Sequence, residues 1–377
     1  MDFSFNEEQQ ALAALAGRIF ADRAGHERLR DLEAAGEGFD RELWAELARA
    51  NLLGAALPEE VGGSGLGLLE LCLLLEELGR HLAPVPLFPA LVLGALPLAE
   101  FGSAEQRGRF LPALVRGELV LSAALQETGG VAPERPRTAA RRAGADWLLD
   151  GEKVCVAAAP EAERVLVPAR TGEGAVGVFL VDPRAPGVSL ETQRATNREP
   201  LSRLTLSGVR VPGSDVLGDP ALGAAVVQWT LERALVGLCA VQVGVAEEAL
   251  RRTAEYTGSR RQFGRPIASF QGVALRAADA YIDVEAMRST LWQAAWRLAE
   301  GLPAEREVRA AKWWACRGGQ RVAHTAQHLH GGIGSDVDYP IHRYFLWAKQ
   351  IELTLGAASP QLARLGALLV GAAEARP

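Results

Sequence analysis

Three consecutive segments in the C-terminal half of the chain show the apolar spacing of long helices. They cover residues 224–256, 271–300 and 304–328. Helices in globular proteins average about 11–12 residues, so helices of this length must pack lengthwise against one another to bury their apolar faces. The sequence therefore predicts a helical bundle toward the C-terminus.

The rest of the chain divides into a helical part and a strand-rich part. Helical spacing recurs over residues 7–20, 40–53, 68–78 and 104–114. Residues 119–218 instead carry short apolar runs, bounded mostly by glycine, proline and polar residues, as in an antiparallel barrel or sandwich. A chain of 377 residues has room for two or three domains. We predict an α+β protein with an all-α domain at 1–118, a β domain at 119–218 and a helical-bundle domain at 219–377.

Charge and hydropathy favour a soluble cytoplasmic protein. The net charge of −6 gives no reason to expect nucleic acid or an anionic membrane as a partner. The first residues lack the basic start and apolar run of a signal peptide. The most apolar tract, residues 87–98, contains two prolines and is too short to cross a bilayer.

The four cysteines, Cys72, Cys155, Cys239 and Cys316, are widely separated, with no CxxC pair among them. Buried free thiols are therefore expected rather than disulfides. No histidine or cysteine cluster has the spacing of a zinc site, so no metal is predicted.

The residues by themselves show no metal, catalytic-triad or phosphate-loop pattern. Five short motifs nevertheless occur in order along the chain: LPEEVGG at 57–63, EELGR at 76–80, RRQFGRPI at 260–267, FQ at 270–271 and HGGIG at 330–334. Together with the order of helices, strands and helices, these motifs resemble the acyl-CoA dehydrogenase family. The resemblance covers the whole chain and implies a helical N-terminal domain, a middle antiparallel β-barrel and a C-terminal four-helix bundle.

The resemblance also implies a chemistry. In this family FAD mediates α,β-desaturation of an acyl-CoA thioester, and the electrons pass to an electron-transfer flavoprotein. A carboxylate removes the α-proton while the β-hydrogen leaves as hydride. The reaction requires a desolvated base, donors for the enolate oxygen, and cations and backbone amides for the cofactor diphosphate.

By resemblance, two segments of this chain contact the FAD of a neighbouring subunit. The residues concerned are Arg260, Gln262, Phe263, Gln271, His328, Gly331 and Gly332. The family usually has glutamine where His328 stands. The plainer alternative for residues 260–266 is an exposed basic turn between two helices.

The strand-rich part departs from the family pattern. The stretch QETGG at 126–130 replaces the usual Thr-Glu-Pro followed by Gly-Ser-Asp. Cys155 occupies the position of the tryptophan that stacks on flavin, and Ala157 that of a threonine. A cysteine lacks the stacking area of an indole, so this domain is predicted either to hold its own flavin weakly or to serve as scaffold.

The usual catalytic glutamate is missing, because Leu355 stands at its position. Some relatives place the base on the first long C-terminal helix, within a Leu-Glu-Arg sequence, and Glu232 lies in such a sequence here. The equivalent position, however, is Ala234, and two residues rotate a helix by about 200°. Glu232 is therefore a weak candidate for the base, against the alternative of a solvated glutamate at the start of a helix.

These losses resemble the glutamate-lacking subunit of heteromeric acyl-CoA dehydrogenases of bacterial steroid side-chain degradation. The prediction is an α2β2 assembly in which a glutamate-bearing partner supplies the base. Two alternatives stay open. One is an autonomous homotetrameric dehydrogenase that uses Glu232, and the other is a non-catalytic family member that binds acyl-CoA or a protein partner.

Overall fold

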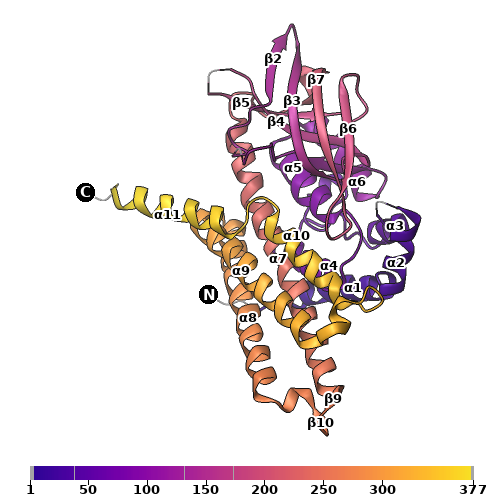
Figure 1. Cartoon of the computed structure of the whole chain (residues 1–377). Helices are drawn as coiled ribbons and strands as arrows, with labels where there is room; N and C mark the ends of the chain where they lie inside the picture. Colours follow the sequence, from indigo (N-terminus) through magenta and orange to yellow (C-terminus); the bar gives the residue numbers. More distant parts are fainter. Residues whose placement is uncertain (1–3, 38, 131, 173, 375–377) are drawn as a thin grey trace. The chain divides into compact units, whose positions relative to one another are not determined.

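The structure is a computed structural model that describes residues 4–374 except 38, 131 and 173 (Figure 1). The chain forms two compact units. One comprises Met1–Asp31, Leu68–Ala83 and Leu235–Pro377, and the other comprises Leu32–Gly67 and Pro84–Ala234.

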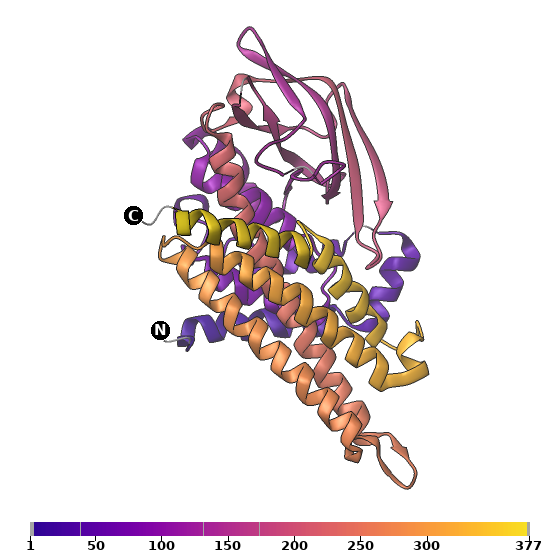
Figure 2. The same cartoon turned by 60° about the vertical axis from the view of Figure 1, so that its left-hand side comes forward.

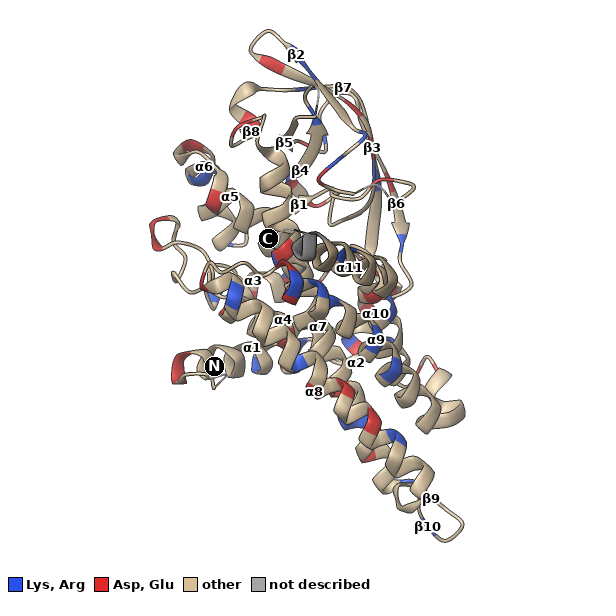
Figure 3. Cartoon of the chain, turned by 90° about the vertical axis from the view of Figure 1, so that its left-hand side faces the viewer, with Lys and Arg blue, Asp and Glu red and all other residues tan. Residues whose placement is uncertain are grey.

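The first unit is helical. Its elements are α1 (Glu7–Arg23), α4 (Leu68–His81), the C-terminal part of α7 (Gly223–Ser259), α8 (Gln271–Ala299), α9 (Glu305–His330), α10 (Ile341–Leu353) and α11 (Ala358–Glu374), with the start of α2 (His26–Ala35). Figures 1 and 2 show α8 and α9 side by side. Charged residues of both signs recur along α8, as expected for a helix with one polar face (Figure 3).

Helices α4 and α7 pack closely because each has a glycine at the point of contact. A Cβ atom on Gly79 of α4 would lie 2.1 Å from the carbonyl oxygen of Val241, and one on Gly244 of α7 would lie 1.9 Å from that of Glu76. Both distances are far below van der Waals contact, so any larger residue would force the helices apart. The leucine-rich α4 is accordingly buried on most of its circumference.

The second unit combines helices with a mixed β sheet. Its helices are α3 (Arg41–Arg49), a π-helix at Phe88–Ala95, α5 (Leu96–Phe101), α6 (Ala104–Val115) and the N-terminal part of α7. The strands are β1 (Val120–Ala123), β2 (Ala139–Ala143), β3 (Asp146–Ala157), β4 (Ala162–Arg170), β5 (Val176–Val181), β6 (Val188–Arg194), β7 (Pro200–Val211) and β8 (Val216–Leu217).

The strand order is β6-β7-β3-β2-β4-β5-β8, with β1 beside β4. Most pairings are antiparallel, as predicted, but β4 pairs in parallel with both β1 and β2. The predicted β domain is therefore present as a mostly antiparallel sheet with these two parallel pairings. Alternating residues of the long strands build one apolar core around Trp147 and Phe179, whose ring centroids lie 5.5 Å apart.

Three of the four cysteines are buried and all four thiols are free. The exception to the expected burial is Cys155, which is exposed. It lies where the pairing of β3 with β7 shifts register between Lys153 and Val156. A bulge of this kind leaves one residue unpaired and turns its side chain outward.

Two segments of the described chain are long and apolar enough to cross a membrane by length and composition alone. The first is α7, and most of its apolar window is buried within the protein, as in a core helix of a soluble protein. The second runs over Ile341–Val370, through α10 and α11, and is mostly exposed.

Candidate cofactor site and active site

The motif at 260–267 forms a tight hairpin between α7 and α8. Strands β9 (Arg261–Gln262) and β10 (Arg265–Pro266) pair antiparallel around Phe263 and Gly264. Both turn residues have positive φ, 52° and 78°, as in a two-residue type I′ turn, which prefers Asn-Gly. A phenylalanine in this conformation costs roughly 1–2 kcal/mol.

The strained Phe263 ring is 91% exposed. It meets Phe270 edge-on at 6.1 Å, and its other faces point into solvent. The side chains of Arg260, Gln262 and Gln271 are also exposed. Strain persists in folded proteins mostly where function uses it, so the hairpin has the properties of a surface that contacts another molecule.

The second predicted segment lies at the end of α9. Gly331 caps the helix with a φ of 66°, and its N–H donates to the carbonyl of His328. A Cβ atom on Gly331 or Gly332 would meet nothing within 4 Å. The backbone at these two glycines therefore borders open space, and a ligand could approach it closely.

His328 is exposed and lines a cavity of about 810 Å³ between α8 and α9. The same cavity contains Asp283 of α8 and Arg321 of α9, which form a bidentate ion pair with Nε–Oδ2 at 2.7 Å. Within the described part of this chain, no hydrogen bond or ion pair joins the hairpin to residues 328–332. The two predicted cofactor-contacting segments are thus separate exposed surfaces of one helical unit.

Leu355, which is predicted to stand at the position of the family's catalytic glutamate, lies in a strained turn between α10 and α11. Leu355 is half-buried with a φ of 57°, and Gly356 follows with a φ of 97°. The Gln361 side-chain amide donates to both carbonyl oxygens, at 3.0 Å and 3.1 Å, and its own oxygen accepts from Arg309 Nη1 at 3.0 Å. Both bracing side chains are buried.

The turn therefore keeps a defined geometry without any group that could accept a proton. Gln361 and Arg309 were not predicted from the sequence. The signal for them was weak, since a buried arginine on an amphipathic helix looks like an ordinary polar position.

Glu232, the alternative base, lies in the part of α7 that belongs to the second unit. It is half-buried, and its Oε1 accepts from Gln228 Nε2 at 3.0 Å. The Glu232 side chain is therefore only partly exposed to solvent. Ala234, which is predicted to be the position at which some relatives carry the base, is completely buried. The neighbouring Arg233 lies over the Trp229 ring at 3.6 Å, and burial lowers the pKa of its guanidinium to about 10.

Cys155, which is predicted to stand at the flavin-stacking position, is an exposed thiol on strained backbone. Cys155 has a φ of 54°, and burial of its sulfur on one side raises the pKa of the thiol. Two residues on, the Ala157 carbonyl accepts a bond from Ser122 Oγ at 2.6 Å. Neither residue offers an aromatic face or a hydroxyl toward a ligand.

A buried ion pair that the sequence did not reveal lies nearby in the sheet. Glu127 Oε1 accepts from Lys153 Nζ at 2.7 Å and from the N–H and hydroxyl of Thr138, and Oε2 accepts from the N–H of Arg137. Burial alone would raise the pKa of Glu127, but the charge and hydrogen bond of Lys153 and the bonds from Thr138 lower it to about 2. This carboxylate is fully engaged in the fold and is a poor base.

Metal-ligating side chains do not cluster within the described ranges. No group of three or more His, Cys, Asp or Glu side chains among them is placed to hold a metal ion.

Comparison with known proteins identifies the family. The chain matches the N-terminal domain of acyl-CoA dehydrogenase over residues 6–118, the middle domain over 123–209 and the C-terminal domain over 222–369. It is 41% identical to the acyl-CoA dehydrogenase FadE27 of Mycobacterium tuberculosis, over 97% of this chain and 98% of that protein.

Solved structures agree. A variant of the Tcur3481-Tcur3483 steroid ACAD has a TM-score of 0.92 and 49% identity, covering 98% of this chain and 99% of that chain. The ChsE4-ChsE5 complex from Mycobacterium tuberculosis has a TM-score of 0.93 and 41% identity, covering 100% of both chains. The chain therefore belongs to the acyl-CoA dehydrogenase family of FAD-dependent oxidoreductases.

Proposed function

We propose that this chain is one subunit of a heteromeric α2β2 acyl-CoA dehydrogenase, in which a second, glutamate-bearing family member supplies the catalytic base. The observation that carries the proposal is the turn at Leu355. Its geometry is braced by two buried side chains, yet it presents an isobutyl group where the reaction needs a carboxylate.

The cofactor-facing residues support a site shared between subunits. The exposed hairpin with Phe263 and the open backbone at Gly331 and Gly332 fit a flat, phosphate-bearing cofactor bound across an interface. Arg260 would reach its diphosphate, and Gln262, Gln271 and His328 would complete the contacts. When bound, FAD supplies the acceptor for the hydride. The Cys155 side of this chain, by contrast, offers no stacking surface.

The chain's own contribution near the substrate is then binding and exclusion of water rather than proton transfer. Leu355 would form an apolar wall of the acyl pocket, which lowers the local polarity around a carboxylate brought by the partner. The two heteromeric neighbours favour a steroid-derived acyl-CoA as substrate, since one of them is a steroid ACAD. Electron-transfer flavoprotein as the electron acceptor, a cytoplasmic location and the domain boundaries at 118/119 and 218/219 belong to the same proposal.

Two alternatives make different predictions. Glu232 is half-buried and bonded to Gln228, which favours a homotetramer with its own base more than a solvated glutamate would. A non-catalytic family member that binds acyl-CoA or a protein partner is compatible with Cys155 and Leu355.

The deciding measurement is the ratio of flavin to protein, from visible absorbance, for the chain purified alone and after co-expression with a family member that has glutamate at the position of Leu355. We expect colourless protein alone, and a flavin-containing complex that desaturates acyl-CoA after co-expression. Glu232→Gln in this chain should leave that activity unchanged.

Near one FAD per chain in the protein alone, with bleaching by acyl-CoA that Glu232→Gln abolishes, would instead establish the autonomous enzyme. Colourless protein in every combination, with acyl-CoA still bound, would leave the non-catalytic alternative.

A further inference from the structure

The helical unit contains a second cavity, of about 420 Å³, that is distinct from the hairpin and from the Gly331 loop. It lies where the corner between α1 and α2, the end of α4, the C-terminal part of α7 and the start of α10 meet. We call it the arginine cavity. Its lining includes Arg80, Arg251, Arg252 and Arg343, the imidazoles of His26 and His81, and one carboxylate, Glu248.

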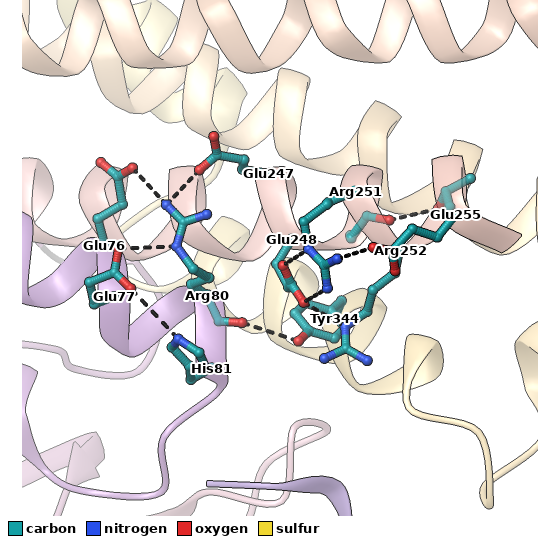
Figure 4. A network of polar contacts seen from close by, with 12 residues as sticks. Glu76, Glu77, Arg80, His81, Glu247, Glu248, Arg251, Arg252, Glu255 and Tyr344 are labelled. Carbon is teal, nitrogen blue, oxygen red and sulfur yellow. Dashed lines mark hydrogen bonds and ion pairs between the residues drawn. The ribbon is translucent and has the colours of Figure 1, made fainter. Parts of the chain in front are cut away.

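The carboxylates around the arginine cavity form ion pairs with particular arginines (Figure 4). The charge of Arg80 is neutralised by three glutamates. Glu77 lies 3.0 Å from its Nε, Glu247 lies 2.6 Å from its Nη2, and Glu76 lies farther away, at 3.4 Å from Nη2. His81 lies 3.6 Å from Glu77. These pairs neutralise one side of the cavity.

On the other side, two arginines share the one carboxylate of the cavity lining. Glu248 is shared by two guanidinium groups, accepting from Arg251 at 2.6 Å and 2.7 Å and from Arg252 Nε at 2.8 Å. Glu255 helps to neutralise Arg251. Arg252 uses only its Nε on Glu248, and its terminal nitrogens lie beside the Tyr344 ring, 5.5 Å from the guanidinium carbon (Figure 4).

A buried histidine N–H adds a second kind of donor. His26 Nδ1 accepts from Arg343 Nε at 3.1 Å, and because a guanidinium can only donate, the proton of the neutral ring sits on Nε2. That nitrogen is buried and makes no hydrogen bond of good geometry within the described residues. Burial and the Arg343 charge lower the pKa of His26, while a hydrogen-bonding contact with the backbone of Asp338 opposes the shift.

We propose that the arginine cavity binds the phosphate group of a small organic phosphate. The terminal nitrogens of Arg252 and the Nε2–H of His26 are the donors, and the Arg343 charge reinforces them. A lining with several arginine and imidazole donors and a single carboxylate suits a phosphate rather than a cation. The volume lies within the range of small-molecule sites, and Ala21, Leu29 and Leu82 give it an apolar wall for an organic body.

The test is a calorimetric titration of the full-length chain with AMP and, separately, with inorganic phosphate. We expect Arg252→Gln to weaken AMP binding by about tenfold or more, since a charge-assisted bond to phosphate is lost. Glu248→Gln should strengthen it, because a competing carboxylate is removed. Binding of AMP but not of inorganic phosphate identifies an organic phosphate as the ligand; equal affinity for the two identifies free phosphate.

Two control variants test whether the effect is specific to the arginine cavity. Arg317→Gln makes the same charge change at an exposed position of α9 and should leave the affinity unchanged. Arg260→Gln alters the proposed flavin contact and should also leave it unchanged, so the result does not depend on the proposed function.

Three results would overturn the proposal. They are no binding at millimolar AMP and phosphate, equal weakening by Arg252→Gln and Arg317→Gln, or loss of binding with Arg260→Gln alone. Should Arg252→Gln fail to fold, Arg252→Lys replaces it, with weaker AMP binding expected because the planar donor pair is lost.

Discussion

Replacing Glu127 by glutamine should destabilise the sheet strongly, because it leaves the buried ammonium group of Lys153 without a counter-charge. The Lys153 side chain is fully buried, and within the described residues its ammonium has one hydrogen-bond partner, Glu127 at 2.7 Å. Breaking a buried ion pair from one side leaves an uncompensated charge and costs about 3–5 kcal/mol. Glutamine would also turn an amide N–H₂ toward the N–H of Arg137 or of Thr138, where the carboxylate now accepts.

Lys153→Met should cost less than Glu127→Gln. It removes the charged group together with its desolvation penalty, and Glu127 would keep its bonds from Thr138 and from the N–H of Arg137. We expect a loss of roughly 1–3 kcal/mol, the usual cost of one missing hydrogen bond to a buried charged group. The asymmetry between the two variants follows from the number of donors that each partner retains.

The stability that the Glu127–Lys153 pair contributes should also depend on pH. The folded-state pKa of Glu127, about 2, lies below its ordinary value of 4.5. A depressed carboxyl pKa contributes stability that is complete above the unfolded value and is lost as the pH falls toward 2. A shift of this size corresponds to roughly 3 kcal/mol. The stability difference between the wild-type chain and Glu127→Gln should therefore shrink between pH 5 and pH 2.

Urea unfolding followed by tryptophan fluorescence and far-ultraviolet circular dichroism measures these differences without adding salt. The matched control is Glu191→Gln on β6 of the same sheet, an exposed glutamate 3.5 Å from Arg203. Its effect should stay below about 0.5 kcal/mol. If Glu127→Gln shifts the unfolding midpoint no more than the control does, the buried pair does not stabilise the sheet.

Three further predictions concern strained or exposed positions. A thiol reagent should modify one cysteine in the folded protein, Cys155, and more slowly than a free thiol at neutral pH, because the raised pKa leaves less thiolate. Phe263→Asn should raise the free energy of unfolding by up to about 1 kcal/mol, since asparagine suits a positive φ, yet lower the flavin content of the co-expressed complex. Gln361→Leu should cost about 2–3 kcal/mol in urea unfolding, because the carbonyls of Leu355 and Gly356 lose their donor.

Each of these has an outcome that contradicts it. Modification of two or more thiols before unfolding would mean that the buried cysteines are accessible. Unchanged flavin content with Phe263→Asn would remove the aromatic ring from the proposed cofactor contact. An unfolding midpoint for Gln361→Leu equal to that of the wild-type chain would show that water or neighbouring groups replace the amide.

The sequence predicted the long helices well, because few other structures produce apolar spacing of this period over several turns. Helices α7, α8 and α9 end within a few residues of their predicted limits. Strands β2 and β6 were missed, since AARRA has one buried residue and VSLETQR has none, so neither contains the short apolar run by which the other strands were found. The tract at 87–98 was treated only as too short for a membrane span, whereas the structure forms a buried π-helix there and continues into α5.

The candidate site was predictable as a set of motifs but not as a geometry. The motif at 260–267 gave Arg260 and Phe263, but the positive φ of Phe263 depends on the hairpin register and is invisible in the amino-acid sequence. Likewise Glu127 and Lys153 are 26 residues apart, and only strand pairing brings them together. Local patterns report helices and turns, whereas pairs distant in sequence require the fold.

The geometry of the turn at Leu355 supports the proposal that another subunit carries the catalytic carboxylate. A left-handed leucine costs roughly 1–2 kcal/mol, and such strain persists only where surrounding contacts over-determine it. Here those contacts are the buried Gln361 and Arg309. If residue 355 had no role, glycine at this position would relieve the backbone strain. This chain instead has an apolar side chain on a turn whose carbonyls are held by Gln361. This combination fits the proposed wall of the acyl pocket, because the backbone is held in place and Leu355 adds no charge near a base carried by another subunit.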